Sequence, residues 1–152
     1  MLNDFIREDG KLYIGDSGEK IILPIKKELE RFRKEKKPVF YICDCHQPND
    51  KEFNLFPPHC LSGTEGANII EKLKPSKNDF IINKRRYSGF FQTDLDISLK
   101  EEGIVELKLV GVCTNICILY TAVSARMLNY KVTVLKDAVA SFDQLAHDFA
   151  LK

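Results

Sequence analysis

The stretch that decides the fold runs from residue 104 to residue 135 and reads IVELKLVGVCTNICILYTAVSARMLNYKVTVL. Two apolar runs within it, residues 104–112 and 131–135, have the length and β-branched content of buried strands. The segment between them, residues 115–128, is apolar almost all round and predicts a buried helix. A strand, a helix and a second strand in this order predict parallel strands joined by a crossover helix.

The rest of the chain continues this alternation. Residues 38–43 (PVFYIC) predict another buried strand, and residues 79–83 (DFIIN) a weaker one. Residues 21–36, 67–73 and 93–102 carry apolar side chains at helical spacing. We therefore expect a three-layer, Rossmann-like α/β fold, with a mainly parallel sheet flanked by helices. Active sites in such folds lie beyond the carboxyl ends of the strands.

Composition and charge exclude several classes of protein. The 152 residues, 44% hydrophobic and 30% charged, suit a single globular domain over residues 1–152. A formal net charge of +1 lacks the strong excess of basic residues that is typical of nucleic-acid binders. No apolar stretch approaches the roughly 20 residues that span a bilayer, and the five cysteines favour free thiols in a reducing cytoplasm. We expect a small-molecule substrate, and a homo-oligomer stays open.

Cys117 lies at the turn between a predicted strand and a predicted helix, in the segment VGVCTNIC at residues 110–117. Thr114 is a candidate helix N-cap, which would place Cys117 in the first helical turn. The helix dipole and the free backbone N–H groups there would stabilise a thiolate and lower the pKa of the thiol. A buried, inert cysteine is the alternative, and placement alone leaves both open.

A long loop after the strand at 38–43 carries candidate metal ligands. Residues 43–60 read CDCHQPNDKEFNLFPPHC, with Asp44 and His46 two apart and His59 later. Two imidazoles and a carboxylate suit zinc, iron or manganese, although Asp44 and His46 could instead close a hydrogen-bonded turn. Three cysteines offer a rival zinc site: Cys43, Cys45 and Cys60. The first two flank Asp44 and so face the other side of the strand, which disfavours that site.

The run GVCTNICILYTAVSARMLNYKVTVLKDAVASFDQLAHDFAL at residues 111–151 resembles the signature of the isochorismatase-like cysteine hydrolases. Its marks are G-V-x-T-x-x-C, a small-residue helix and D-A-x-A-S, and the resemblance covers nearly the whole chain. It implies that Cys117 is the nucleophile of an amide hydrolase. It also implies a cis peptide between Val112 and Cys113, with an oxyanion hole formed by the backbone N–H groups of Cys113 and Cys117.

The segment NKRRYSGFFQTDL at residues 83–95 matches the family pattern of a lysine, Y-S-x-F and T-x-L. The resemblance implies that Lys84 is the catalytic lysine, whereas Arg85 and Arg86 are interpreted as solvated or structural. The third catalytic group of the family is an aspartate in the pattern D-x-x-x-D-F. Asp4 and Phe5 match only the end of that pattern, so the catalytic aspartate is expected just before Met1, together with the first strand of the sheet. We therefore expect a chain that is cut at both ends or carries a mistaken start site and, without that aspartate, a poor or inactive enzyme.

The loop motifs resemble those of the nicotinamidase/pyrazinamidase branch, which carries D-x-H, then P-P-H-C and G-T-x-G. This implies one divalent metal ion, zinc or else iron or manganese, with the ligands Asp44, His46, Glu52 and His59. Asp50 is the second choice for the loop ligand. The resemblance also implies that aromatic residues hold the substrate ring: Phe5, Phe56 and Tyr87.

The activity implied is hydrolysis of nicotinamide to nicotinate and ammonia, through a cysteine thioester, in NAD salvage. Two alternatives stay open. One is another amidase of the same superfamily, acting on a ureido-acid or carbamoyl substrate, and the other is a catalytically inactive homologue.

Overall fold

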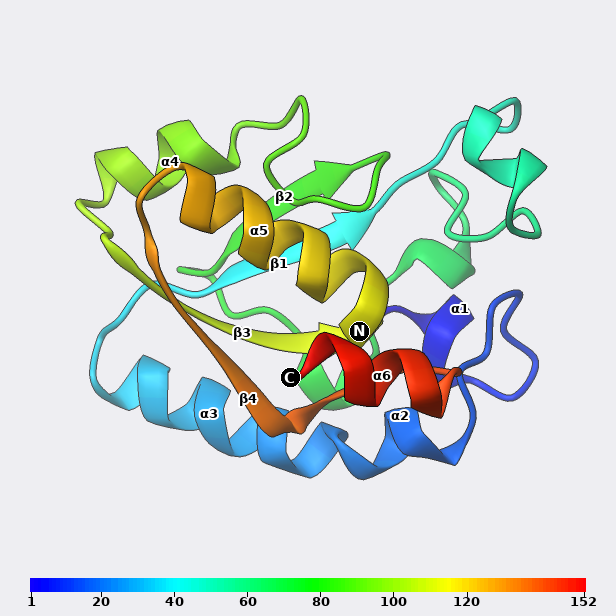
Figure 1. The fold of residues 1–152 in the computed structure, drawn as a ribbon, viewed down its shortest axis with the longest axis horizontal. Helices are drawn as coiled ribbons and strands as arrows, with labels where there is room; N and C mark the ends of the chain where they lie inside the picture. The colour runs from blue at the N-terminus through cyan, green and yellow to red at the C-terminus, as the bar shows by residue number, and fades with distance from the viewer.

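The four strands pair in parallel (Figure 1). A computed structural model describes residues 1–152. β1 (Phe40–Asp44) pairs with β2 (Phe80–Lys84), and β3 (Glu106–Val112) pairs with β4 (Lys131–Ala140). The four predicted strands are confirmed, and β4 continues past its predicted end at residue 135.

The helices match the prediction where the apolar pattern is long. They are α1 (Asn3–Ile6), α2 (Asp16–Lys20), α3 (Ile22–Lys34), α4 (Leu95–Glu101), α5 (Leu119–Met127) and α6 (Gln144–Ala150). The prediction of a helix over residues 67–73 is wrong. Two 3₁₀ turns stand there, η2 (Glu65–Ala67) and η3 (Glu71–Leu73), separated by extended backbone. Ile69 in that gap forms an antiparallel bridge with Leu2, a non-local pairing that local periodicity does not reveal.

Two apolar clusters fill the layers on either side of the strands. One joins Ile22 and Ile25 of α3 to Cys43 of β1 and Ala138 of β4. The other joins α4 and α5 to β2 and β3 through Ile82, Leu95, Leu99, Leu107 and Ala125. Helices thus cover both faces of the strands, as the three-layer prediction requires (Figure 1).

The helix after β3 is only partly buried, so the prediction that it is buried all round is wrong. Thr121 and Ala125 of α5 face the core. Tyr120, Val123 and Met127 are 50%, 47% and 72% exposed. Packing within this chain therefore does not account for all the apolar side chains of α5. A homo-oligomer remains an open expectation. None of the helices combines the length and apolarity needed to cross a membrane.

The strands form two separate pairs, because β1 and β3 are not hydrogen-bonded to each other. The carboxyl ends of the two pairs nevertheless meet in one place. Lys84, the last residue of β2, contacts Cys117, which follows β3. This meeting point is where parallel α/β folds place their sites.

Candidate active site

Cys117 lies in a tight turn that links β3 to α5. The turn is one π-helical turn, η4 (Thr114–Ile118), preceded by a cis peptide between Val112 and Cys113 as predicted. The prediction that Thr114 caps the helix is wrong. Cys113 holds the cap position without a side-chain bond, and the Thr114 hydroxyl instead pairs with His147 Nδ1 at 2.8 Å. Cys117 is half-buried and lines a pocket.

Lys84 is in direct contact with Cys117. Its Nζ lies 3.4 Å from Cys117 Sγ, donates to the Arg86 carbonyl oxygen at 2.9 Å and forms an ion pair with Asp44. Asp44 and Lys84 are register partners at the ends of β1 and β2, which explains why they meet. The Lys84 side chain is only 3% exposed, so this ammonium acts on its neighbours with little screening by water. Burial alone would lower the pKa of Lys84, but Cys117 and Asp44 outweigh that effect and raise it.

The thiol of Cys117 does not have the lowered pKa that its position in the sequence predicts. Burial raises its pKa, and the Asp44 carboxylate adds to the rise. Lys84 and the backbone N–H of Cys113 act in the opposite direction. The desolvation of the thiol therefore outweighs the effect of its two stabilising neighbours on the pKa. The backbone N–H of Cys113 thus acts on the reactive sulfur. The oxyanion hole implied for Cys113 and Cys117 stays a prediction.

Three side chains converge on one point beside the thiol. Asp44, His46 and His59 place their ligand atoms within 4.8 Å of one another, and all three are buried. His46 Nδ1 pairs with Asp50 at 3.1 Å, and His59 Nδ1 pairs with the Pro57 carbonyl oxygen at 2.8 Å. These contacts leave the Nε2 atom of each ring free to face inwards, the arrangement typical of metal-binding histidines.

The donor set fits a divalent metal ion, because two of its atoms are otherwise without a partner. His46 Nε2 and Glu52 Oε2 are buried and make no hydrogen bond. Buried polar atoms rarely stay unpaired, so both favour a cation at this point. Glu52 Oε1 lies 3.8 Å from His46 Nε2, and burial together with Asp44 raises the pKa of Glu52 to about 7. The predicted ligands are thus brought together, with Glu52 beside the trio of Asp44, His46 and His59.

Asp50, the second choice for the loop ligand, serves another purpose. It contacts the outer nitrogen of His46 and accepts from Arg85 Nε and Arg86 Nη1, each at 2.8 Å. Burial would raise the pKa of Asp50, but its donors, Arg85 first, lower it overall. Asp50 therefore holds the His46 ring in place through Nδ1, while Nε2 stays available to a metal ion. The two arginines are structural, as predicted, because they compensate a buried carboxylate.

We expect Asp50→Asn to weaken zinc binding by about 10- to 100-fold, because the charged partner of His46 is lost while the ligands remain. Titration calorimetry of the metal-free protein with zinc measures this directly. Asp79→Asn is the matched control, since Asp79 is also buried and paired with an arginine, Arg33, at 2.5 Å. An equal loss of zinc affinity in both variants would contradict the role given to Asp50.

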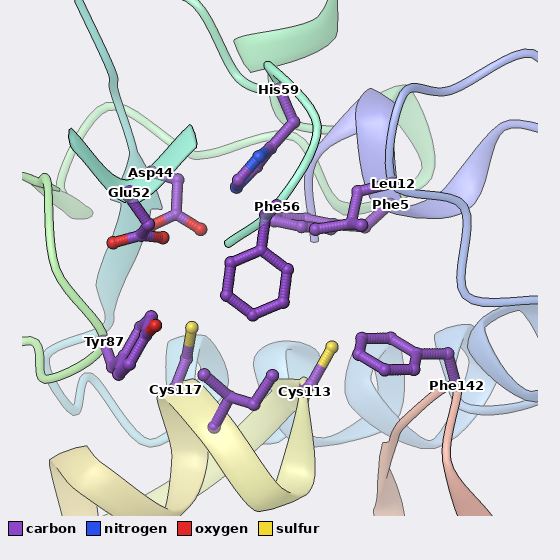
Figure 2. A pocket seen from close by; sticks show the side chains of 11 residues that line it. Phe5, Leu12, Asp44, Glu52, Phe56, His59, Tyr87, Cys113, Cys117 and Phe142 are labelled. Carbon is purple, nitrogen blue, oxygen red and sulfur yellow. The ribbon is translucent and has the colours of Figure 1, made fainter. Parts of the chain in front are cut away.

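The predicted substrate-binding aromatics surround the same pocket as the thiol. Phe5, Phe56 and Tyr87 line it together with Cys117 and His59 (Figure 2). Phe56 and Tyr87 meet edge to face with ring centroids 6.2 Å apart. The free space between the side chains is only about 20 Å³, room for a water molecule but not for an aromatic ring. A side chain at the mouth must therefore move when a ring enters.

Three lining residues were not predicted from the sequence: Leu12, Ile116 and Phe142. Phe142 is 48% exposed and lines the pocket together with Cys113 (Figure 2). Its position directly after the D-A-x-A-S motif was the available signal. Asp4, by contrast, lies in α1, and its carboxylate accepts from the backbone N–H groups of the loop residues Lys11 and Cys60 at 3.1 and 2.6 Å.

Comparison with known proteins agrees with this geometry. The isochorismatase domain model matches residues 1–152. A Bacillus subtilis protein described as an uncharacterized isochorismatase family protein, PncA, is 42% identical over 159 residues, which cover 98% of this chain and 87% of the relative.

Two solved structures are also similar. The nicotinamidase PncA from Bacillus subtilis superposes with a TM-score of 0.91 at 38% identity, covering 99% of this chain and 87% of that one. The N-carbamoylsarcosine amidase from Thermoplasma acidophilum gives a TM-score of 0.91 at 36% identity, covering 98% and 85%. With its cysteine, lysine and fold arranged as described, this chain belongs to the isochorismatase family of hydrolases.

Proposed function

We propose that this protein is a nicotinamidase, which hydrolyses nicotinamide to nicotinate and ammonia. The observation that carries the proposal is the meeting of two groups of side chains in one pocket. The Cys117–Lys84 pair can attack an amide, and the donors Asp44, His46 and His59 suit a metal ion. A pyridine carboxamide suits both groups, because Cys117 can attack its carboxamide carbon and a metal ion can bind its ring nitrogen.

The chain's own residues account for the acyl transfer. Cys117 sulfur bonds to the carboxamide carbon, and the resulting oxyanion accepts from the backbone N–H groups of Cys113 and Cys117. The C–N bond breaks and ammonia leaves with the proton of the thiol. Water then cleaves the thioester, which yields nicotinate and restores the thiol.

The metal site would bind the substrate rather than activate the nucleophile. Asp44, His46 and His59, with Glu52, would hold a divalent ion, zinc in the first instance, that acts as a Lewis acid towards the ring nitrogen. Phe5, Phe56 and Tyr87 would pack against the ring. Nicotinate is the product expected of an NAD salvage enzyme, and the five free cysteines fit work in a reducing cytoplasm.

The direct test is ammonia release from nicotinamide and from N-carbamoylsarcosine, with metal content measured in the same samples. The proposal expects hydrolysis of nicotinamide and about one equivalent of metal. We expect His59→Ala to lose the metal and raise KM more than it lowers kcat. His147→Ala is the control for metal content, because this histidine lies outside the site on α6.

A second candidate function is the hydrolysis of a carbamoyl or ureido substrate, favoured by the similarity to the N-carbamoylsarcosine amidase. Hydrolysis of that amide alone would replace the proposed substrate and leave Cys117 as the nucleophile. Release of ammonia from neither, by protein that is folded and has metal bound, would favour an inactive homologue.

A further inference from the structure

Residues 85–89 form the loop that follows β2, and two hydroxyl groups of α5 hold it in place. We call these residues the lysine loop, because they come directly after the lysine of the site. Ser88 Oγ donates to Ser124 Oγ at 2.8 Å, and the backbone N–H of Gly89 donates to Thr121 Oγ1 at 2.9 Å. Thr121 and Ser124 are thus the two points at which the lysine loop is hydrogen-bonded to α5.

The lysine loop is packed tightly at Gly89. A methyl group added there would lie 3.1 Å from side-chain atoms of Ile42 and Leu95 and 3.5 Å from the Thr121 methyl group. Gly89 is buried and Thr121 is 6% exposed, so loss of the Thr121 hydroxyl would leave the Gly89 N–H without a partner. The place of Gly89 in the fold therefore depends on β1, on α4 and on the hydroxyl of α5.

The lysine loop meets the active site at two residues that directly precede the pair held by α5. Lys84 Nζ donates to the Arg86 carbonyl oxygen at 2.9 Å, and the same nitrogen lies 3.4 Å from Cys117 Sγ. Tyr87 lines the same pocket as Cys117 (Figure 2). A movement of the loop would therefore change both the contacts of the buried ammonium and the wall of the pocket.

The two hydroxyls and the nucleophile belong to one helical segment. The turn η4, which holds Cys117, runs directly into α5. Thr121 therefore comes about one turn and Ser124 about two turns after the nucleophile. Neither of them lines the pocket, so their hydroxyls act on the site through the lysine loop.

From this geometry we propose that Thr121 and Ser124 are positioning residues of the active site. Their hydroxyls fix the lysine loop relative to Cys117, so that the Arg86 carbonyl oxygen holds the Lys84 ammonium against the sulfur. The proposal concerns the reactivity of the thiol, and it holds whichever amide the enzyme hydrolyses.

The test compares Thr121→Val with Thr121→Ser in the alkylation of Cys117 by iodoacetamide, followed at that residue by tandem mass spectrometry. Valine keeps the shape of threonine without its hydroxyl, whereas serine keeps the hydroxyl. We expect Thr121→Val to slow alkylation at neutral pH by about threefold to tenfold and to move its pH profile to higher pH, because the ammonium then stabilises the thiolate less. Thr121→Ser should keep the rate to within about twofold. Ser124→Ala is a second, milder variant at a half-buried site, and its profile should move in the same direction.

Tyr130→Phe is the matched control, since it removes a buried hydroxyl that donates to Asp96 at 2.8 Å, beyond the other end of α5. It should lower the Tm and leave the alkylation profile of Cys117 in place. Hydrogen exchange measured by NMR reports on the loop itself: the Gly89 amide should exchange faster in Thr121→Val and not in Tyr130→Phe.

Three outcomes would overturn the proposal. If Gly89 exchange is unchanged in Thr121→Val, the hydroxyl does not hold the loop. If the Gly89 amide is released while the alkylation profile stays in place, the loop does not position the ammonium. An equal shift of the profile in Tyr130→Phe would mean that general loosening of α5 accounts for the effect.

Discussion

Cys117→Ala should abolish ammonia release from nicotinamide, with a loss of about 10⁴-fold or more in kcat/KM. The sulfur lines the pocket and lies 3.4 Å from the buried ammonium of Lys84. Removing the attacking atom removes the covalent route, and the remaining binding and oxyanion groups sustain little catalysis alone. Steady-state ammonia release measures the loss, and mass spectrometry of the quenched enzyme should show the nicotinoyl adduct only when Cys117 is present.

Cys117→Ser should be nearly as damaging as Cys117→Ala. A hydroxyl has a far higher pKa than a thiol, and a site that already raises the pKa of the thiol by burial will not ionise it. Cys45→Ala is the control, since Cys45 is a partly exposed cysteine outside the pocket lining. Comparable loss in the Cys45 variant, or substantial activity in Cys117→Ala, would contradict the assignment of the nucleophile.

Local sequence patterns were enough to predict where in the fold the site lies. The strand ending at Val112 and the helix that begins soon after it placed Cys117 at the carboxyl edge of the strands before any contact was known. The spacing of Asp44 and His46 predicted that both face the same way at the end of β1, and the structure brings them together with His59. The identity of Lys84 depended on family resemblance, because a single lysine carries no local signal.

Features that depend on non-local contacts could not be predicted from the sequence. The Asp44–Lys84 ion pair follows from the register of β1 against β2, which nothing within either segment specifies. The role of Asp50 required knowing that Arg85 and Arg86 fold back onto it across 35 and 36 residues of sequence. The sign of the pKa shift at Cys117 depended on its burial, and helix position alone pointed the wrong way.

The wrong prediction of a helix over residues 67–73 also arose because a non-local contact determines the structure there. Its apolar spacing is real, since Ile70 and Leu73 are buried in the core. The bridge between Ile69 and Leu2 nevertheless holds the chain extended there, and that contact joins residues far apart in the sequence. Tertiary pairing outweighed a weak local preference for helix.

Lys84→Met should both destabilise the protein and make Cys117 less reactive. Methionine keeps much of the side-chain volume but leaves the Asp44 carboxylate, 6% exposed, without its partner. Removing one member of a buried ion pair costs about 3–5 kcal/mol of unfolding free energy. Chemical denaturation measures that loss, and the double variant Lys84→Met/Asp44→Asn should recover part of it, because no charge is then left alone.

The effect of Lys84→Met on the thiol has a definite sign. The ammonium lowers the pKa of Cys117 against the burial that raises it, so its removal lets that pKa rise further. Each unit of rise reduces the thiolate fraction at pH 7 about tenfold. Alkylation of Cys117 by iodoacetamide should therefore slow at neutral pH, and its pH profile should move to higher pH. Lys84→Arg keeps the positive charge and should shift the profile less. If the alkylation profiles of Lys84→Met and the unaltered protein coincide, the ammonium does not tune the nucleophile, and its contact with Cys117 serves only to balance Asp44.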